Sequence, residues 1–408
     1  MQSTFSDARG LFLKGVEHFE AGEPQAALER FQASLQLLPG RVSTLTNLAA
    51  AQIALHQPAA ALESLEQALA TAPDDTDAWW HRGIALTDLQ RFGEALAAFD
   101  RVLVLQPGRC EAWVRHGQAL QQLDRPQDAL RSYDKALTID TSMAPAWTQR
   151  GDVLKDLGRC VEAAQAYRKA LAAGGDAQML GYFLAAVEPP SDPRDVPAIA
   201  PAPYVQDLFD NYAQSFDTHL VEVLDYQAHT VLVAQLAQLQ RARFKRALDL
   251  GCGTGLCGPL LRPLAEILEG VDLSQQMLDQ ARTRQVYAHL VQADLVQYLR
   301  TTDQRYDLVL AADVFIYIGD LAPLFGAVAQ TMDPQGLFCF SIETPDGTGE
   351  FELKVSLRYG QSEAYVRRLA AQNGFELLTL LRAHIRQEKQ QDIAGLYVVL
   401  RKCLVALG

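Results

Sequence analysis

Hydrophobic positions recur with two different periods along the 408 residues, and the change of period predicts two kinds of domain. Up to about residue 177, apolar and small side chains recur at helical spacing in units of 34 residues. From residue 246 onward, short apolar runs end in glycine or aspartate and alternate with helical patterns, which is typical of a parallel sheet covered by helices. Between the two regions, residues 188–203 contain six prolines and predict a semi-rigid linker.

Four positions mark the repeated unit. They are Trp79, Trp113 and Trp147; Gly83, Gly117 and Gly151; Ala95, Ala129 and Ala163; and Phe99, Tyr133 and Tyr167. The frame extends backwards and gives five units, which begin at residues 8, 42, 76, 110 and 144. Small residues let the two helices of a unit approach closely, and the large ring fills the gap beside them. The tryptophans are therefore expected to be core residues.

This spacing of aromatic, glycine and alanine positions resembles the tetratricopeptide repeat. The resemblance implies an all-α solenoid over residues 8–187, with five repeats and a capping helix at its end. It also implies a groove that binds a protein or peptide partner. Candidate groove residues, for which ordinary solvated surface is the alternative, are Asn47, His81, Arg82, Arg115, His116 and Arg150.

A strand followed by a glycine-rich loop organises the second region. The short apolar run over residues 247–250 leads into glycines at 251, 253 and 255, and a helix is expected to follow. Glycine permits a sharp turn and a close approach of the backbone to a ligand, and the N–H groups of the helix would point at that ligand. This is the general nucleotide-binding device.

Three aspartates argue against a dinucleotide as that ligand. Asp249 lies within the strand end, Asp272 closes the next apolar run, and Asp294 closes the one after it. An acid that ends one strand can accept hydrogen bonds from ribose hydroxyls, and an acid that ends the next can accept one from an adenine amino group. Asp249 is placed to receive hydrogen bonds from a cationic amino-acid moiety.

The glycine loop, residues 270–281, Ala293-Asp294 and residues 306–313 together resemble the class I S-adenosylmethionine-dependent methyltransferases, in that family's order and spacing. The resemblance covers residues 204–402. It implies an α/β Rossmann-like domain with a seven-stranded, mostly parallel sheet, and S-adenosylmethionine as cofactor. The cofactor-binding residues that it implies are Asp249, Gly251, Gly253, Gly255, Asp272, Leu273, Asp294, Leu295 and Tyr212.

Residues 204–240 precede the first strand and are predicted to form helices. Tyr212 and Phe216 belong to a set of apolar residues at helical spacing in this region. In the methyltransferases such helices often fold over the cofactor, which makes both aromatics candidate lid residues. The alternative is that they face the core of the domain.

The sequence says less about the residues that contact the methyl acceptor. Methyl transfer is an in-line displacement in which proximity and orientation do much of the catalysis, and a base is required only if the accepting atom carries a proton. Ligands of such sheets lie beyond the carboxyl ends of the strands. Asp313 and Tyr359 are our candidates for catalytic residues that touch the acceptor.

Charge and cysteine content limit the remaining possibilities. A formal charge of −13 argues against a nucleic-acid partner. The six cysteines form no C-x-x-C pair and have no histidine at zinc spacing, so we expect no metal site and reduced thiols in the cytoplasm. The sequence shows no signal peptide, and no apolar run is long enough for a membrane span.

These observations predict a methyltransferase of enzyme class 2.1.1 with a partner-binding repeat array. The array either recruits a protein substrate or docks an enzyme that modifies a small, quinone-like molecule. A third hypothesis is a scaffold that binds the cofactor without turnover. The sequence does not identify the methyl acceptor, the partner of the array or the oligomeric state.

Overall fold

The computed structural model describes residues 2–239, 243–388 and 391–404, and it divides into two compact units. The first unit comprises Met1–Leu180 and the second Gly181–Gly408. The division falls inside helix α11 (Ala177–Val187), the segment that the sequence predicts as a cap of the repeats. The predicted linker over residues 188–203 contains the short helix η1 (Pro193–Asp195), and its last two residues already belong to helix α12 (Ala202–Tyr212). Each unit is described by itself.

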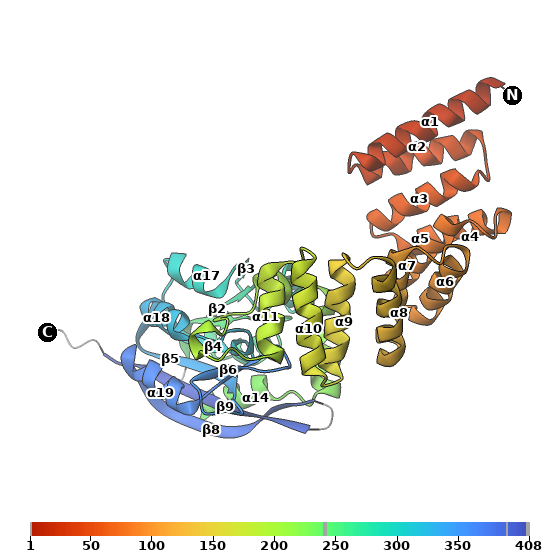
Figure 1. The fold of residues 1–408 in the computed structure, drawn as a ribbon. Coiled ribbons are helices and arrows are strands. Elements are labelled where there is room, and N and C mark those ends of the chain that lie inside the picture. The colour runs from red at the N-terminus through yellow and green to blue at the C-terminus, as the bar shows by residue number, and fades with distance from the viewer. Residues whose placement is uncertain (1, 240–242, 389–390, 405–408) are drawn as a thin grey trace. The chain divides into compact units, whose positions relative to one another are not determined.

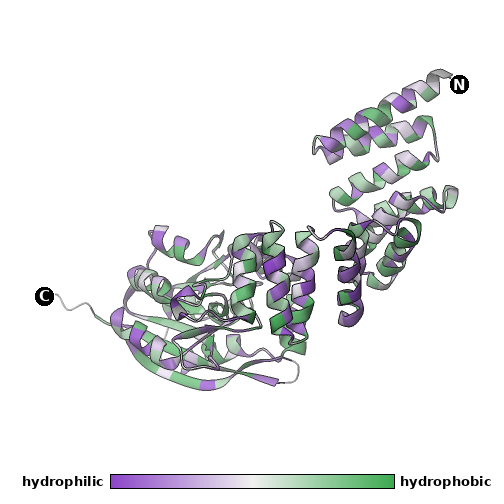
Figure 2. Cartoon of the chain, in the orientation of Figure 1, coloured by the Kyte–Doolittle hydropathy of each residue, from purple (hydrophilic) through white to green (hydrophobic). Residues whose placement is uncertain are grey.

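The first unit consists of five helix pairs in chain order (Figure 1). The members of a pair pack against each other, and successive pairs pack in turn. Figure 2 shows hydrophilic and hydrophobic residues alternating along these helices, as expected where one face is buried. The pairs are α1 (Gln2–Glu20) with α2 (Pro24–Leu37), α3 (Val42–Ala54) with α4 (Pro58–Thr71), α5 (Thr76–Asp88) with α6 (Phe92–Leu105), α7 (Cys110–Gln122) with α8 (Pro126–Ile139), and α9 (Ala144–Asp156) with α10 (Cys160–Ala172).

The glycine of a repeat lies directly beneath the ring of the same repeat. A Cβ atom added to Gly83 would lie 2.5 Å from the ring of Phe99, and one added to Gly117 would lie 2.6 Å from that of Tyr133. The second repeat has Ala49 at the glycine position, and the smaller Leu65 replaces the ring there. The repeat spacing in the sequence therefore results from one packing contact in each unit, in which a helix backbone packs against a large side chain.

The repeat tryptophans are half-buried, so the expectation that they are core residues is only partly right. Each indole N–H donates to a backbone carbonyl six residues earlier, in the turn that ends the preceding repeat. The nitrogen–oxygen distances are 2.8 Å for Trp79, 3.0 Å for Trp113 and 2.9 Å for Trp147. The acceptor is a main-chain group, and this explains why Thr141 can stand where the other two turns have proline.

The second unit is a nine-stranded sheet in the order β3-β2-β1-β4-β5-β7-β6, with β9 paired to both β5 and β8. The prediction of a mostly parallel sheet is confirmed, but its seven strands are corrected to nine. The strands are β1 (Phe244–Leu250), β2 (Ala265–Asp272), β3 (His289–Gln292), β4 (Tyr306–Ala311), β5 (Met332–Glu343), β6 (Phe351–Leu353), β7 (Tyr359–Gln361), β8 (Phe375–Glu388) and β9 (Gln391–Lys402).

Helices cover both faces of this sheet. On one face, α17 (Leu295–Thr301), α18 (Ala322–Thr331) and α19 (Glu363–Gln372) bury a cluster that includes Val309 and Phe338. On the other face, α14 (Ala228–Gln238) and α15 (Gly258–Leu261) bury a cluster that includes Leu308 and Cys339. Neighbouring residues of one strand thus serve opposite cores, as the two-residue period of a strand requires. The helix α16 (Gln275–Thr283) follows β2.

Five parallel strands carry their carboxyl ends to one edge of the sheet. Strands β3, β2, β1, β4 and β5 pair in parallel, so the residues that follow β1, β2, β3 and β4 gather there. The remaining short elements before the sheet are α12 (Ala202–Tyr212), α13 (Phe216–Thr218), the π-helical turn η2 (His219–Val223) and, after β4, η3 (Phe315–Tyr317). This edge holds the candidate site.

Candidate functional site

The glycine loop after β1 adopts backbone conformations that only glycine tolerates well. Gly251, Gly253 and Gly255 have φ angles of 73°, 52° and 81°. A Cβ atom on Gly251 would lie 2.6 Å from the side chain of Val314. The N–H groups of Gly251 and Cys252 donate to the Val271 carbonyl at 2.8 and 3.0 Å, which ties the loop to the end of β2. The loop is therefore a rigid cradle rather than a mobile turn.

The helix expected after this loop is much shorter than the general device requires. The helix α15 has four residues and begins at Gly258, three residues after the last loop glycine. So short a helix has little macrodipole. Ligand binding at this loop must instead depend on the loop backbone and on nearby acidic side chains.

Asp249 is buried at the end of β1, with 1% of its surface exposed. The hydroxyl of Tyr287 donates to its Oδ2 at 2.6 Å. Burial raises the pKa of Asp249 to about 7, although the Tyr287 hydrogen bond opposes this and favours the carboxylate. A cation placed against Asp249 would restore its charge.

Asp272 and Asp294 each hold part of the fold as well as lining the site. The Oδ2 atom of Asp272 accepts from the Gly253 N–H at 2.8 Å, and its Oδ1 accepts from the Ser274 N–H at 2.9 Å. Burial raises the pKa of Asp272, and these backbone hydrogen bonds act in the opposite direction. Asp294 caps the first turn of α17, where its Oδ1 accepts from the Gln297 N–H at 2.9 Å.

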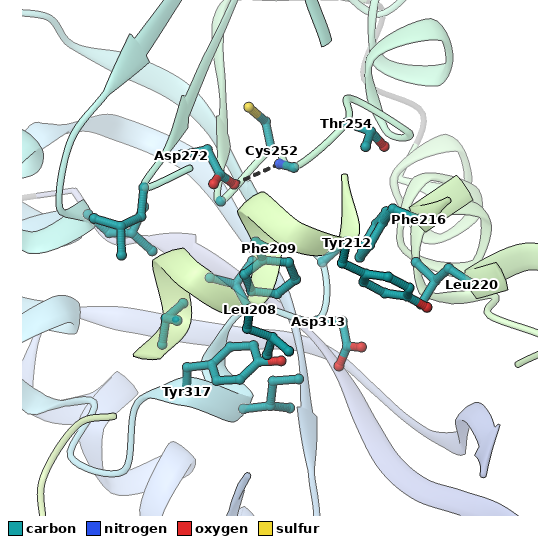
Figure 3. A pocket seen from close by; sticks show the side chains of 18 of the residues that line it. Leu208, Phe209, Tyr212, Phe216, Leu220, Cys252, Thr254, Asp272, Asp313 and Tyr317 are labelled. Carbon is teal, nitrogen blue, oxygen red and sulfur yellow. Dashed lines mark hydrogen bonds between the residues drawn. The ribbon is translucent and has the colours of Figure 1, made fainter. Parts of the chain in front are cut away.

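One cavity of about 540 Å³ brings the predicted residues together (Figure 3). Every predicted cofactor residue except Gly255 lines it. The lining members of that prediction are Tyr212, Asp249, Gly251, Gly253, Asp272, Leu273, Asp294 and Leu295. Gly255 faces away, since a Cβ atom there would lie 2.9 Å from the ring of Tyr287. Such a volume falls in the range of small-molecule sites, about 300–1,000 Å³.

The helices before the sheet cover this cavity as a lid, which we define as residues 202–226. In Figure 3 the lid side chains Phe209 and Tyr212 lie between Asp272 on one side and Asp313 on the other, and Phe216 lies next to Tyr212. Ring centroids are 5.2 Å apart between Tyr212 and Phe216 and 6.0 Å apart between Phe209 and Phe216. Both aromatics that the sequence selected line the cavity. The rest of the predicted region differs, because α14 packs on the sheet instead.

Polar contacts fasten the lid to the glycine loop and to the start of α16. Asp210 accepts a hydrogen bond from the Ser274 hydroxyl at 2.5 Å. Asp217 accepts from the Thr254 hydroxyl and pairs with Arg284, whose Nε also donates to the Thr254 carbonyl at 2.6 Å. The lid and the cofactor loop therefore form one connected structure.

Asp313, a predicted catalytic residue, lines the cavity beyond β4 but is strongly held. It has a positive φ of 59°, and its N–H donates to the Ser341 hydroxyl at 2.8 Å. Arg386 donates from Nη1 to both carboxylate oxygens, at 3.0 and 2.9 Å. Arg386 is itself buried, with 1% of its surface exposed, and also pairs with Glu343 and Glu388. A carboxylate engaged in this way is a poor general base.

Tyr359, the second predicted catalytic residue, does not reach the cavity. Its side chain is fully buried, and its hydroxyl donates to the Pro197 carbonyl at 2.6 Å. It is not among the residues that line the cavity. The structure gives Tyr359 a packing position, where it holds the segment that leads into the lid.

Sequence reasoning missed Arg358 and Arg386, both of which line the cavity. The register of β8 and β9 shifts between His384 and Arg386, and this bulge buries Ile385 and Arg386 in succession. Simple alternation would have placed one of them in solvent. The sequence of the strand contains no clear signal, because β8 also carries the exposed Arg382 and several other polar residues.

Within residues 2–239, 243–388 and 391–404, histidines, cysteines and acidic residues form no cluster of three or more that could bind a metal ion. The helices of the same residues include none with the length and apolar character that crossing a membrane requires.

Comparisons with known proteins agree with this division. Residues 248–340 match the methyltransferase domain family, and residues 46–109 and 114–178 match the tetratricopeptide repeat. The predicted combination of the two is thereby confirmed.

Curated relatives match part of the second unit. A malonyl-[acyl-carrier protein] O-methyltransferase of Pseudescherichia vulneris is 31% identical over 133 residues, which cover 33% of this chain and 51% of that protein. A trans-aconitate 2-methyltransferase of Rhizobium leguminosarum bv. trifolii is 32% identical over 117 residues, with coverage of 28% and 44%. A ubiquinone biosynthesis O-methyltransferase of Hydrogenovibrio crunogenus is 29% identical over 112 residues, with coverage of 26% and 46%. The chain spans about half the length of these relatives.

Proposed function

We propose that this chain transfers the methyl group of S-adenosylmethionine to a small acceptor that binds beneath the lid. In this proposal, tetratricopeptide repeats are joined to a class I S-adenosylmethionine-dependent methyltransferase domain. The observation that carries the proposal is the single cavity, which has the glycine loop at one end and Asp313 at the other. Cofactor and acceptor would lie in one enclosed space, where orientation of the reacting groups is most effective.

The residues present fit the cofactor. The buried carboxyl of Asp249, whose pKa burial raises to about 7, suits the cationic amino group of the amino-acid moiety. Asp272 keeps lone pairs for ribose hydroxyls in addition to its two backbone hydrogen bonds, and Asp294 lies where an adenine amino group would donate. When bound, the cofactor supplies an electrophilic methyl group. The chain supplies position, and the lid excludes water.

We further propose that neither of the two predicted catalytic residues acts as a strong general base. Asp313 is engaged by Arg386, and Tyr359 lies outside the cavity. An acceptor atom that arrives without a proton needs no base. Two of the relatives above are named O-methyltransferases, which supports an oxygen acceptor.

The repeat array has a separate role in this proposal. It binds a protein or peptide partner and so places the enzyme, as solenoids of this kind do with their extended surfaces. The position of the cavity beneath the lid favours docking of an enzyme for small molecules over recruitment of a protein substrate. The cytoplasmic location stays a prediction, supported by six free cysteines.

Methyl transfer from isotope-labelled cofactor into host lysate, separated into protein and small-molecule fractions, tests the proposal. We expect label in the small-molecule fraction. The control is Gly251→Val, in which the side chain would collide with Val314 and strain a backbone of φ 73°, so that labelling is lost.

Two other results would replace this function. Label in one protein band would make the array a substrate-recruiting arm. Cofactor binding without any labelled product, in the presence of the natural partner, would identify a scaffold.

A further inference from the structure

The end of the cavity away from the glycine loop combines apolar walls with two arginines. Arg358 and Arg386 line it together with the hydroxyl-bearing Tyr317 and the carboxylate of Asp313. The surrounding apolar residues are Val205, Leu208, Phe209, Leu220, Ile316 and Ile318. Charged side chains are costly in such surroundings unless they are paired or have a ligand to bind.

Arg386 is fully occupied by the protein. Its Nη1 pairs with Asp313, its Nη2 with Glu343 and its Nε with Glu388, the last at 2.7 Å. Lys354 also lies 3.8 Å from Glu343. Arg386 therefore organises the acidic residues of this wall, and its donors are already used.

Arg358 differs because its hydrogen bonds leave part of the guanidinium open. Among the described residues, its Nη1 pairs with Glu388, and its guanidinium also hydrogen-bonds the side chain of Tyr317. Its side chain keeps 25% of its surface exposed. A guanidinium carries five N–H donors, and the edge formed by Nε and Nη2 matches a carboxylate. The hydrogen bond places Tyr317 beside this guanidinium; burial raises the pKa of the Tyr317 hydroxyl, and both the charge and the hydrogen bond of Arg358 oppose that rise.

The turn that carries Arg358 is held in an unusual conformation. Leu357 has a φ of 62°, which is uncommon for a residue with a branched side chain. The buried hydroxyl of Tyr182 donates to the Leu357 carbonyl at 2.6 Å, and the Lys354 N–H donates to the Arg358 carbonyl at 2.9 Å. The fold thus maintains local strain at the position that brings Arg358 to the cavity.

We infer that Arg358, with Tyr317 beside it, forms a carboxylate-binding subsite for a small, largely apolar acid that is the methyl acceptor. The inference rests on the proposed function and adds the chemical class of the acceptor. The acid group binds the open edge of Arg358, and its apolar body packs against the lid residues Leu208 and Phe209. Glu388 remains paired with Arg386 when the acid binds, so the ion pairs at this end of the cavity are kept.

Calorimetric titration of the full chain with octanoate and with octanamide tests the subsite. The two probes share an apolar body and differ in charge. We expect octanoate to bind roughly tenfold to a hundredfold more tightly, the range for a charge-assisted pair. Arg358→Gln should remove this preference. The control is Arg367→Gln on α19, an exposed arginine also paired with a glutamate, which should retain it. Arg358→Lys keeps the charge, loses the bidentate edge and should show an intermediate preference.

Equal affinities for octanoate and octanamide in the unaltered protein would overturn the inference, and so would a preference that survives in Arg358→Gln. If that variant does not fold, an unreduced preference in Arg358→Lys overturns it instead. S-adenosylhomocysteine is titrated separately. Its failure to bind would overturn the proposed function, whereas the comparison of octanoate with octanamide in ligand-free protein would still decide the subsite.

Discussion

Burial changes the chemistry of individual acidic residues at the cofactor end of the cavity. Asp249 is enclosed by β1, by the Tyr287 ring and by the glycine loop, and Asp272 lies close enough to disfavour a second negative charge. The pKa of Asp249 is raised to about 7 as a result. A raised carboxyl pKa means that ionising Asp249 costs folding free energy once the pH exceeds its unfolded value, and a bound cation recovers this cost.

This gives a pH dependence of cofactor binding. The cation requires ionised Asp249, so the affinity for S-adenosylhomocysteine should rise as the pH rises towards and through about 7. Between pH 5.5 and 7.5 we expect a gain of roughly twentyfold, because a carboxyl with a pKa of about 7 is almost fully protonated at the lower pH and must first lose its proton. Isothermal titration at both pH values measures it. Asp249→Asn should bind more weakly with a flatter profile; an equally steep profile in that variant would assign the titration to another group, such as Asp272.

At the scale of the element, close packing of a helix backbone against a ring explains the repeats. Gly117 lies on α7 and Tyr133 on α8, and the ring occupies the space that a Cβ atom would need. The shared face of each pair is buried, and its small positions are therefore as constrained as its large ones. The lid is constrained in a different way, since Asp210 and Asp217 tie it to the loop by polar contacts.

Gly117→Ala should therefore destabilise the repeats even though alanine is the better helix former. The added Cβ would lie 2.6 Å from the Tyr133 ring, and overpacking of this kind costs about 1–3 kcal/mol. The matched control is Gly10→Ala on α1, where a Cβ meets nothing within 4 Å and helix propensity should add about 0.5–1 kcal/mol of stability. Chemical unfolding followed by circular dichroism compares the two. Equal changes in stability in the two variants would show that the Tyr133 ring is not the reason for glycine at position 117.

At the scale of the whole molecule, two separate sets of hydrophobic clusters stabilise the chain. One set lies between the paired helices of the repeats, and the other lies on the two faces of the sheet. The residues that line the cavity lie between positions 199 and 386 of the chain, and all of them belong to the second unit. Binding at this cavity should stabilise the unit that contains it.

Calorimetric unfolding of the full chain should accordingly show two transitions. S-adenosylhomocysteine at a hundred times its Kd should stabilise the transition of the second unit by about 2.7 kcal/mol and leave that of the repeats unchanged. Gly117→Ala should lower the other transition alone. A single transition that shifts as a whole with ligand would mean that the two units unfold as one.

The sequence by itself determined the features that depend on short-range order. The 34-residue period follows from contacts between adjacent helices, and the positive-φ glycines and the acids that end strands are set by the local backbone. Position along the chain therefore sufficed to predict the repeats and the parallel sheet, and eight of the nine residues predicted to bind the cofactor line one cavity, Gly255 being the exception.

Only the tertiary structure decided the acceptor end of the site. Arg386 meets Asp313 from 73 residues away and Glu343 from 43, after a bulge has changed which side chains of β8 point inward. Tyr359 does not reach the cavity, because its hydroxyl donates to the Pro197 carbonyl instead. Strands β6 and β7 have three residues each, too few to show a period, so the sheet was expected to be smaller. Long-range pairing has no local pattern, because the free energy that fixes it comes from partners that only folding brings together.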